Sequence, residues 1–565
     1  MKGKIILVVI VLLALFLRVY GYNWDDNQHL HPDERFLTMV ATDSHIPSSF
    51  FDYLNPATST LNPYNLGFNF YVYGTFPVTL VKILAVGYGM DNYQDIVLIG
   101  RILSAVADVG TLLMLFMLVR IWQKRYHLPE WTAHLSAFFY AIAVLPIQQS
   151  HFFTVDTFAT FFVCMALVMA SLYVSKPSLT YIILGAIGMG LALGSKVSTF
   201  YSFPLIGIVF CLGVFAQKKH TKTHILQTIE HILLGVLVVY VTLRLSDPRF
   251  FDSASWLYAM PSAIFLENIA ELKRLTNIEA PYPPTLQWVG KTPLLFPLKN
   301  MALFGLGVPY FLLSCVGIVF TFFSKKKEVV FAALWVVGFF LYQGQQNIMT
   351  MRYFYTLYPL LAFFAAWMMT HAIEGLSKKR RYMGVAIVCI IVCVWPLAFM
   401  GMYTQPQTRV EASEWIYDMV PKGSTLLIEH WDDALPLNLP PDKAHRVMRV
   451  ADWYKVLELK VYDPDTEMKK KEIARKLQTA DYYIISSNRA YGSIMSHPER
   501  YPFMSKIYGQ LFDDELGYTK VAEFTADPQL KLGSLKFVIP DQSAEEAFTV
   551  YDHPKVMIYK NERSK

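Results

Sequence analysis

Long apolar runs, separated by short polar segments, occupy most of the first 402 residues of the chain. A helix needs about 20 mostly apolar residues to cross the hydrocarbon core of a membrane. The pattern therefore predicts a multi-pass α-helical membrane protein with about 11 spanning helices. The candidate stretches are 4–21, 96–120, 131–149, 154–174, 178–195, 197–216, 224–243, 301–323, 329–344, 351–371 and 383–402. The pair 178–195 and 197–216 is separated by one residue, so it could form a broken or re-entrant hairpin.

Residues 403–565 follow a different pattern, in which short strand-like and helix-like segments alternate. Alternation of this kind is typical of a soluble α/β domain. We therefore expect a transmembrane domain at 1–402 and a C-terminal α/β domain at 403–565. The expected strands are 425–429, 482–486 and 555–559, and the expected helices are 411–419, 469–478 and 500–512.

Two connecting segments, at about 22–95 and 245–300, are long and rich in aromatic residues and proline. Long ordered loops are usually functional. Residues 78–90 form an apolar run that is too short to span, which predicts a helix lying at the membrane interface.

Composition agrees with a membrane protein, because 54% of the residues are apolar and 17% are charged. In soluble domains about 45–50% of the residues are apolar and about 25% are charged. A large soluble enzyme, a disordered chain and a nucleic-acid binder are therefore excluded. The five cysteines lie in apolar stretches, where they are expected to be small buried hydrophobic residues.

Charge sets the expected orientation. The first 402 residues hold 19 acidic and 28 basic side chains, whereas 403–565 hold 25 and 22. With a cytoplasmic N-terminus, Lys196 is the only basic residue in the short outer loops, and the C-terminal domain is extracytoplasmic. The stretch 4–21 could be a signal peptide, but no small-residue cleavage site follows it, so we expect an anchor. The basic residues of the cytoplasmic loops are Lys124, Arg125, Lys176, Lys218, Lys219, Lys222, Lys325, Lys326, Lys327, Lys378, Lys379, Arg380 and Arg381.

Charged residues at membrane depth mark functional sites by default, and here most candidates lie at the outer ends of helices. Asp33 and Glu34 follow the first span, where a carboxylate could accept a proton from a hydroxyl nucleophile. A helix N-terminus after Pro32 is the alternative role for this pair. Asp156 begins the fourth span, where it could serve the same site or cap its helix.

Three basic or aromatic positions are candidates for binding a phosphate. Lys196 breaks the positive-inside rule, so it is expected to meet an anion, unless it only extends to the lipid headgroups. Arg352 and Tyr353 begin a late span, and arginine suits phosphate oxygens. The alternative for this pair is an interfacial aromatic belt.

Two further groups of polar residues have less definite roles. Arg101 and Asp108 are seven residues apart and share a helix face, which favours a polar network inside the bundle over a direct binding role. His29, His31 and His151, together with nearby carboxylates, could bind a divalent metal ion, although their spacing matches no metal motif. Asp33, Glu34 and His151 are the expected ligands of such an ion.

In this order and topology, these motifs resemble the polyprenyl-phosphate-dependent glycosyltransferases of the GT-C clan. The most similar families are the dolichyl-phosphate-mannose protein mannosyltransferases (family 39) and the lipid A aminoarabinose transferases. The C-terminal stretches 485–492 and 548–555 resemble prokaryotic members that are described only as family 39-like. The shared pattern consists of Asp33-Glu34, Phe70-Tyr-Val-Tyr-Gly74, Gly100-Arg-Ile-Leu-Ser104, Asp156, Arg352-Tyr353 and Tyr358-Pro359. The family commonly has an aromatic residue after the lysine, whereas here Val197 follows Lys196.

The resemblance implies an inverting transfer of one sugar from a polyprenyl-phosphate carrier to an acceptor hydroxyl of a protein, lipid or glycan. Asp33 would be the general base, and Glu34 or Asp156 would orient the acceptor or a metal ion. Arg352 and Lys196, with Tyr353 and Arg101 nearby, would bind the donor phosphate.

Two other functional classes fit a polytopic chain with an outer polar site. A polyprenyl-lipid flippase or transporter would suit it, although such proteins often show paired repeats, and none is visible here. A structural envelope protein would leave the acidic pair with a capping role only.

Overall fold

The computed structural model describes residues 2–216, 222–277, 282–440 and 448–563. It divides the chain into two compact units. The membrane unit comprises Met1–Tyr22, Pro32–Lys273 and Thr292–Pro396, and the C-terminal unit comprises Asn23–His31, Arg274–Lys291 and Leu397–Lys565. The predicted boundary after residue 402 stays a prediction.

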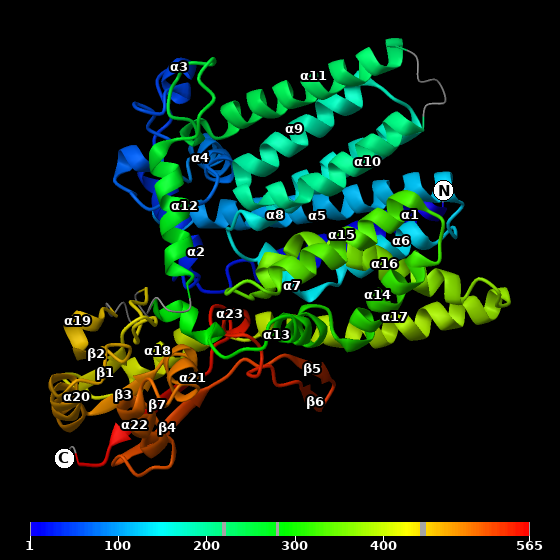
Figure 1. The fold of residues 1–565 in the computed structure, drawn as a ribbon. Coiled ribbons are helices and arrows are strands. Elements are labelled where there is room, and N and C mark those ends of the chain that lie inside the picture. Colours follow the sequence, from blue (N-terminus) through cyan, green and yellow to red (C-terminus); the bar gives the residue numbers. More distant parts are fainter. Residues whose placement is uncertain (1, 217–221, 278–281, 441–447, 564–565) are drawn as a thin grey trace. The chain divides into compact units, whose positions relative to one another are not determined.

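The membrane unit is helical, and each of the eleven apolar stretches is helical along most of its length (Figure 1). Among the residues that the structure describes, five helices are long and apolar enough to cross a membrane, at Tyr93–Tyr126, Asp156–Ser175, Val197–Phe215, Leu226–Ser246 and Lys378–Met400. The predicted class, a multi-pass helical membrane protein with a C-terminal α/β domain, is confirmed.

The described helices of the membrane unit, with η for short 3₁₀ or π turns, have the following bounds: α1 Lys2–Val19, α2 Pro32–Asp43, α3 Phe50–Leu54, η1 Pro63–Leu66, α4 Phe76–Tyr88, α5 Tyr93–Tyr126, α6 Thr132–Ala141, α7 Val144–Ser150, α8 Asp156–Ser175, α9 Leu179–Ser195, η2 Val197–Ser202, α10 Phe203–Phe215, α11 Lys222–Ser246, η3 Pro248–Phe250, α12 Ala263–Leu275, α13 Leu295–Asn300, η5 Met301–Gly305, α14 Val308–Phe322, α15 Lys327–Gln343, η6 Met351–Leu357, α16 Tyr358–Ala372 and α17 Lys378–Met400.

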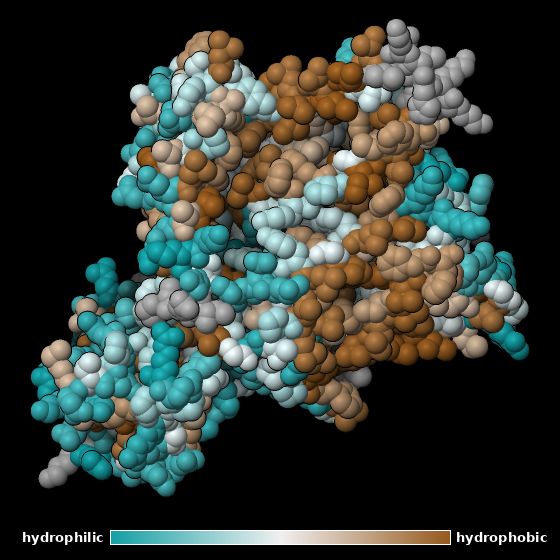
Figure 2. Space-filling view, viewed as in Figure 1, coloured by the Kyte–Doolittle hydropathy of each residue, from teal (hydrophilic) through white to brown (hydrophobic). Residues whose placement is uncertain are grey.

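The surface of this unit shows how it meets lipid. Figure 2 shows apolar surface over α11, where Leu226, Leu233 and Val236 are each more than 60% exposed. A soluble protein would bury such residues, whereas hydrocarbon solvates them at no cost. The protein is therefore located in a membrane.

The closely spaced pair of stretches forms two separate helices. Helix α9 ends at Ser195, and Lys196 has extended backbone angles of φ −154° and ψ 116°. The 3₁₀ turn η2 follows, and Pro204 lies in the first turn of α10, where its missing N–H is not needed. This break holds Lys196 between two helices.

The C-terminal unit contains a five-stranded sheet of order β2-β1-β3-β7-β4 and a separate hairpin, β5-β6. Strand β1 is parallel to β2 and β3, whereas β7 is antiparallel to β3 and β4. The described bounds are η4 Pro283–Trp288, η7 Met402–Thr404, α18 Thr408–Met419, β1 Thr425–Glu429, α19 Val450–Trp453, β2 Lys455–Leu459, α20 Glu467–Thr479, β3 Tyr482–Ile485, α21 Arg489–Met495, α22 Pro502–Phe512, β4 Tyr518–Phe524, β5 Gln529–Leu532, β6 Leu535–Val538, α23 Glu546–Thr549 and β7 Val556–Asn561.

Alternate residues of the strands build two cores. Tyr482 and Ile484 of β3 pack with α18 on one face of the sheet. Tyr483 and Ile485 pack with α20 and α22 on the other face. The period of two in a strand thus divides one apolar run between two buried faces.

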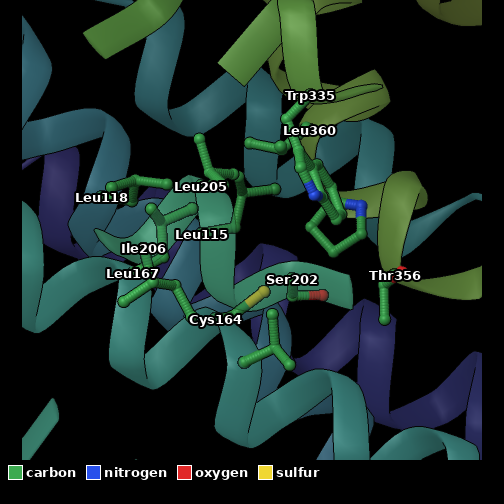
Figure 3. Close-up of a pocket in the computed structure, with 12 residues that line it drawn as sticks. Leu115, Leu118, Cys164, Leu167, Ser202, Leu205, Ile206, Trp335, Thr356 and Leu360 are labelled. Atoms are coloured by element: carbon green, nitrogen blue, oxygen red, sulfur yellow. The ribbon is translucent and has the colours of Figure 1, made fainter. Parts of the chain in front are cut away.

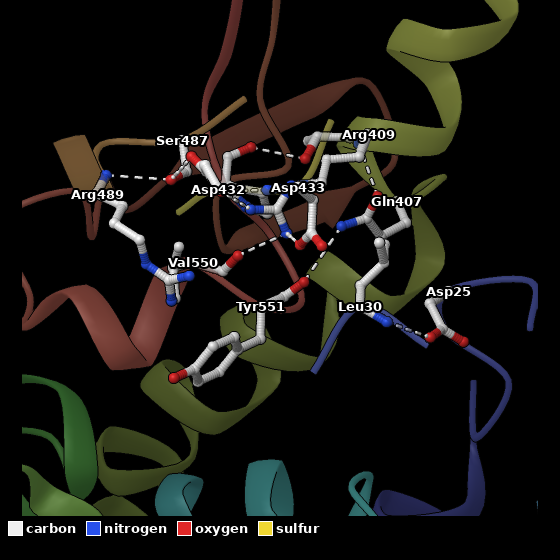
Figure 4. A network of polar contacts seen from close by, with 12 residues as sticks. Asp25, Leu30, Gln407, Arg409, Asp432, Asp433, Ser487, Arg489, Val550 and Tyr551 are labelled. Atoms are coloured by element: carbon white, nitrogen blue, oxygen red, sulfur yellow. Dashed lines mark hydrogen bonds and ion pairs between the residues drawn. The ribbon is translucent and has the colours of Figure 1, made fainter. Parts of the chain in front are cut away.

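A polar network ties together the loops that follow β1 and β3 (Figure 4). Asp432 accepts hydrogen bonds from Arg409 Nη2 at 2.9 Å and from Ser487 Oγ at 2.5 Å. Arg489 Nε donates to Glu546 Oε1 at 2.6 Å, and Arg409 Nη1 donates to the Val550 carbonyl at 2.8 Å. The two family-like stretches 485–492 and 548–555 therefore meet at this network.

Candidate active site

Asp33 lies in the first turn of α2, directly after Pro32. Its carboxylate accepts a hydrogen bond from Arg352 Nη1, and the Tyr73 hydroxyl is close enough to feel its charge. Burial and the neighbouring Asp33 charge hold the pKa of Tyr73 well above its usual value, so this hydroxyl stays protonated. The Asp33 side chain remains 28% exposed, which leaves it accessible.

Asp156 begins α8 and is the central carboxylate of the cluster. Its Oδ1 accepts a hydrogen bond from Lys196 Nζ at 2.6 Å, and its Oδ2 lies 3.2 Å from Arg352 Nε. Its side chain is only 3% exposed. Four sequence-predicted residues thus form one chain of alternating charges, Asp33–Arg352–Asp156–Lys196.

Tyr353 is the fifth predicted residue that joins this cluster. Lys196 Nζ lies 5.0 Å from the centre of the Tyr353 ring, a distance at which a cation is attracted to the ring face. Arg352 and Tyr353 share the turn η6, where Thr350 Oγ1 accepts a bond from the Arg352 amide at 3.4 Å. The turn places one cation and one ring side by side.

Glu34 and Arg101 form a separate, fully buried pair. Arg101 Nε donates to Glu34 Oε2 at 2.9 Å, its Nη2 donates to Oε1, and its Nη1 donates to the Tyr22 carbonyl at 3.0 Å. The Phe153 amide also donates to Glu34 Oε2, at 2.7 Å. Both side chains are 0% exposed, so this pair joins α2, α5 and the loop before α8.

Asp108 belongs to a different network from Arg101, although both are on α5. It accepts hydrogen bonds from Arg18 Nε and from the Tyr140 hydroxyl, each at 2.5 Å, and from the Tyr355 hydroxyl. The helix face that Arg101 and Asp108 share therefore carries two separate hydrogen-bonded networks. The Asp108 network also holds the turn η6 in place, because its member Tyr355 belongs to that turn.

The predicted metal ligands are engaged elsewhere. His151 directs Nδ1 to the Ile147 carbonyl at 2.8 Å and Nε2 to the Tyr20 carbonyl at 2.9 Å. Glu34 is saturated by Arg101 and the Phe153 amide, and Asp33 pairs with Arg352. Within the described ranges no three His, Cys, Asp or Glu side chains are arranged to hold a metal ion. Asp33, Glu34 and His151 therefore do not form such a group in the described part of the chain.

A polar pocket lies at the charged cluster. Asp156, Lys196 and Arg352 contribute charges to its wall, and the hydroxyls of η2 contribute donors. The full lining is Asp156, Ala159, Thr160, Lys196, Ser198, Thr199, Ser202, Phe339, Arg352, Tyr353, Tyr355 and Thr356.

An apolar pocket adjoins the polar one, because both are lined by Ser202 and Thr356. Figure 3 shows Ser202 and Thr356 on the side of the cavity away from Leu118 and Leu167, whereas Leu360 lies beside Trp335. The remaining lining is Leu115, Leu118, Val163, Cys164, Leu167, Leu205, Ile206, Trp335, Pro359 and Leu360. A ligand with an anionic head and an apolar tail would match this arrangement.

Tyr73, the η2 hydroxyls and Tyr355 are site residues that the sequence motifs did not indicate. Tyr73 lies in the aromatic stretch 70–74, which carried the family resemblance without a role for any one ring. Ser198 and Ser202 follow Lys196 in the sequence. Hydroxyl residues beside the lone outer lysine could therefore have indicated that they belong to the site.

Comparisons with known proteins agree with the motifs. The sequence model of the family described as dolichyl-phosphate-mannose-protein mannosyltransferase matches residues 63–245, about a third of the chain. No curated protein matches the chain.

Two solved structures align with most of the chain. The apo oligosaccharyltransferase of Archaeoglobus fulgidus is 14% identical, with a TM-score of 0.50, and the alignment covers 95% of this chain and 75% of that one. The apo form of ArnT from Cupriavidus metallidurans is 12% identical, with a TM-score of 0.38 and coverage of 94% and 97%.

The family match confirms the resemblance that the sequence motifs indicated. Over residues 63–245 the chain is similar to this family of membrane mannosyltransferases, and it shares its fold with the archaeal oligosaccharyltransferase. No finding favours a flippase.

Proposed function

We propose that the charged cluster of the membrane unit transfers one sugar from a polyprenyl phosphate to an acceptor hydroxyl on the extracytoplasmic face, with inversion. The observation that carries this proposal is the pair of adjoining pockets, one cationic and one apolar, that share Ser202 and Thr356. The phosphate would occupy the polar pocket, and the first isoprene units would occupy the apolar one.

Asp33 is the best candidate for the general base. It is 28% exposed, whereas Asp156 is 3% exposed and Glu34 is 0% exposed. Only an accessible carboxylate can contact the hydroxyl whose proton it removes. Asp156 then acts by holding Lys196 and Arg352, and Glu34 acts by fixing the start of α2 through Arg101.

Lys196, Arg352 and the η2 hydroxyls would stabilise the leaving phosphate. Cations and donors fixed in a site of low water content stabilise charge that develops in the transition state. The buried carboxylate of Asp156 keeps both cations in place before the donor arrives. The orientation, with the N-terminus cytoplasmic and the C-terminal domain outside, is part of this proposal and rests on the loop charges.

The test is the release of free polyprenyl phosphate from a panel of polyprenyl-phosphate sugars by the full-length protein in nanodiscs. Acceptor-bearing membranes are supplied, and Asp33→Asn is the matched inactive variant. Release by the wild type that the variant loses would support the proposal and name the sugar. No release from any donor would contradict it.

A further inference from the structure

Arg352 is shared between the base and the wall of the phosphate pocket. Its Nη1 bonds to Asp33, and its Nε lies 3.2 Å from Asp156 Oδ2. Neither this Nε nor this Oδ2 forms a hydrogen bond, although both atoms are buried. Arg352 therefore has a buried Nε that faces Asp156 at the wall of the polar pocket without a hydrogen bond, while its Nη1 engages Asp33.

The charges of the cluster balance before a ligand binds. Two carboxylates, Asp33 and Asp156, face two cations, Lys196 and Arg352. A phosphodiester donor adds one negative charge to this set. It therefore has to compete with a carboxylate for one of the cations, and Asp33 is the more exposed of the two carboxylates.

The reaction also moves negative charge from Asp33 to the phosphate. The acceptor O–H proton passes to Asp33, the acceptor oxygen bonds to the anomeric carbon, and the electrons of the broken C–O bond leave with the phosphate. Asp33 becomes neutral as the phosphate gains a charge. If the Arg352 guanidinium pairs with Asp33 first and with the phosphate afterwards, it always pairs with the group that carries the negative charge.

Resting on the function proposed above, we infer that Arg352 exchanges partners. Asp33 holds it in the ligand-free protein, and the donor phosphate takes it over on binding, which releases Asp33 to accept the acceptor proton. The base is therefore masked while the donor is absent. Asp33 and the phosphate compete for Arg352, so removal of the Asp33 charge strengthens phosphate binding while it slows transfer.

The test measures the affinity of the full-length protein in nanodiscs for a polyprenyl phosphate. Asp33→Asn is expected to bind about tenfold more tightly than the wild type, because one charge-assisted contact no longer competes. Arg352→Gln binds more weakly. In the Arg352→Gln background the Asp33→Asn change gives no gain, because the residue that transmits it is gone. Asp43→Asn, at the other end of α2, is the matched control and binds like the wild type.

Unchanged or weaker binding by Asp33→Asn would overturn the exchange. If Asp33→Asn still increased the phosphate affinity in the Arg352→Gln background, the exchange would also be overturned. The increase would then come from the removal of a nearby negative charge and not from Arg352. Should Asp33→Asn fail to fold, Asp33→Ser provides the same comparison. Absence of binding by every variant would instead overturn the proposed function, and the exchange with it.

Discussion

Replacement of Arg101 by methionine separates a structural role from a role in donor binding. In the structure Arg101 is fully buried and donates to both oxygens of Glu34 and to the Tyr22 carbonyl. The Arg101→Met variant removes the cation and leaves the carboxylate buried at 0% exposure. We expect this loss to act on stability first.

The size of the effect follows from the partners that remain. Breaking a buried ion pair by removing one partner costs about 3–5 kcal/mol, because an uncompensated charge stays behind. The double variant Glu34→Gln/Arg101→Met removes both charges, and the Gln carbonyl still accepts from the Phe153 amide. The Tyr22 carbonyl loses its Arg101 donor, which costs about 1 kcal/mol. The double variant should therefore recover most of the lost stability.

The assay is thermal unfolding of the purified protein in nanodiscs, followed by affinity for a polyprenyl phosphate at a temperature where all variants are folded. Arg101→Met should unfold on the order of 5 °C below the wild type. Arg120→Met, an exposed arginine of the same helix, is the control and should change stability by less than about 0.5 kcal/mol. Wild-type stability with a large loss of phosphate affinity in Arg101→Met would refute this reasoning and place Arg101 in the donor site.

Three further predictions concern the base, the apolar pocket and the C-terminal unit. Asp33→Asn should slow sugar transfer by about 10²–10⁴-fold, measured as release of polyprenyl phosphate, and a fully active variant would remove Asp33 as the base. Leu205→Trp, which fills the apolar pocket, should raise KM for long-chain donors and for a two-isoprene analogue alike, because the first isoprene units would occupy this pocket; an unchanged KM for the two-isoprene analogue would contradict the location of the lipid tail. Glu429 is buried beside Tyr483 and Tyr508, and burial raises its pKa to about 7. Since the folded state binds this proton more tightly, stability should fall by about 3 kcal/mol between about pH 4.5 and 7. Urea unfolding against pH measures this loss, which Glu429→Gln should abolish.

The strands of the C-terminal unit show which parts of the fold the sequence could predict. The expected strands at 425–429, 482–486 and 555–559 correspond to β1, β3 and β7, the central strands, whose residues are mostly buried. Strands β2 and β4 lie at the edges of the sheet and are largely exposed, so their sequences lack a continuous apolar run. The expected helices 411–419, 469–478 and 500–512 are confirmed as α18, α20 and α22.

The sequence could predict those site residues that place a charge next to an apolar, membrane-spanning run, where a charge is costly. Asp156, Lys196 and Arg352 stand out because each lies at the end of an apolar run, and the structure brings them together with Asp33. The pairing of Arg101 could not be foreseen. Its helix face is shared with Asp108, but its partner, Glu34, comes from a segment 67 positions away. Periodicity identifies the face of a helix and leaves open which element packs against it.

The central claim is tested most directly by following a donor labelled in both sugar and phosphate, in proteoliposomes that contain acceptor. The account predicts that labelled sugar appears on the acceptor in a one-to-one ratio with free polyprenyl phosphate, and that Asp33→Asn produces neither. Labelled sugar that stays on its lipid, with only its leaflet changed, would contradict the account and show a flippase.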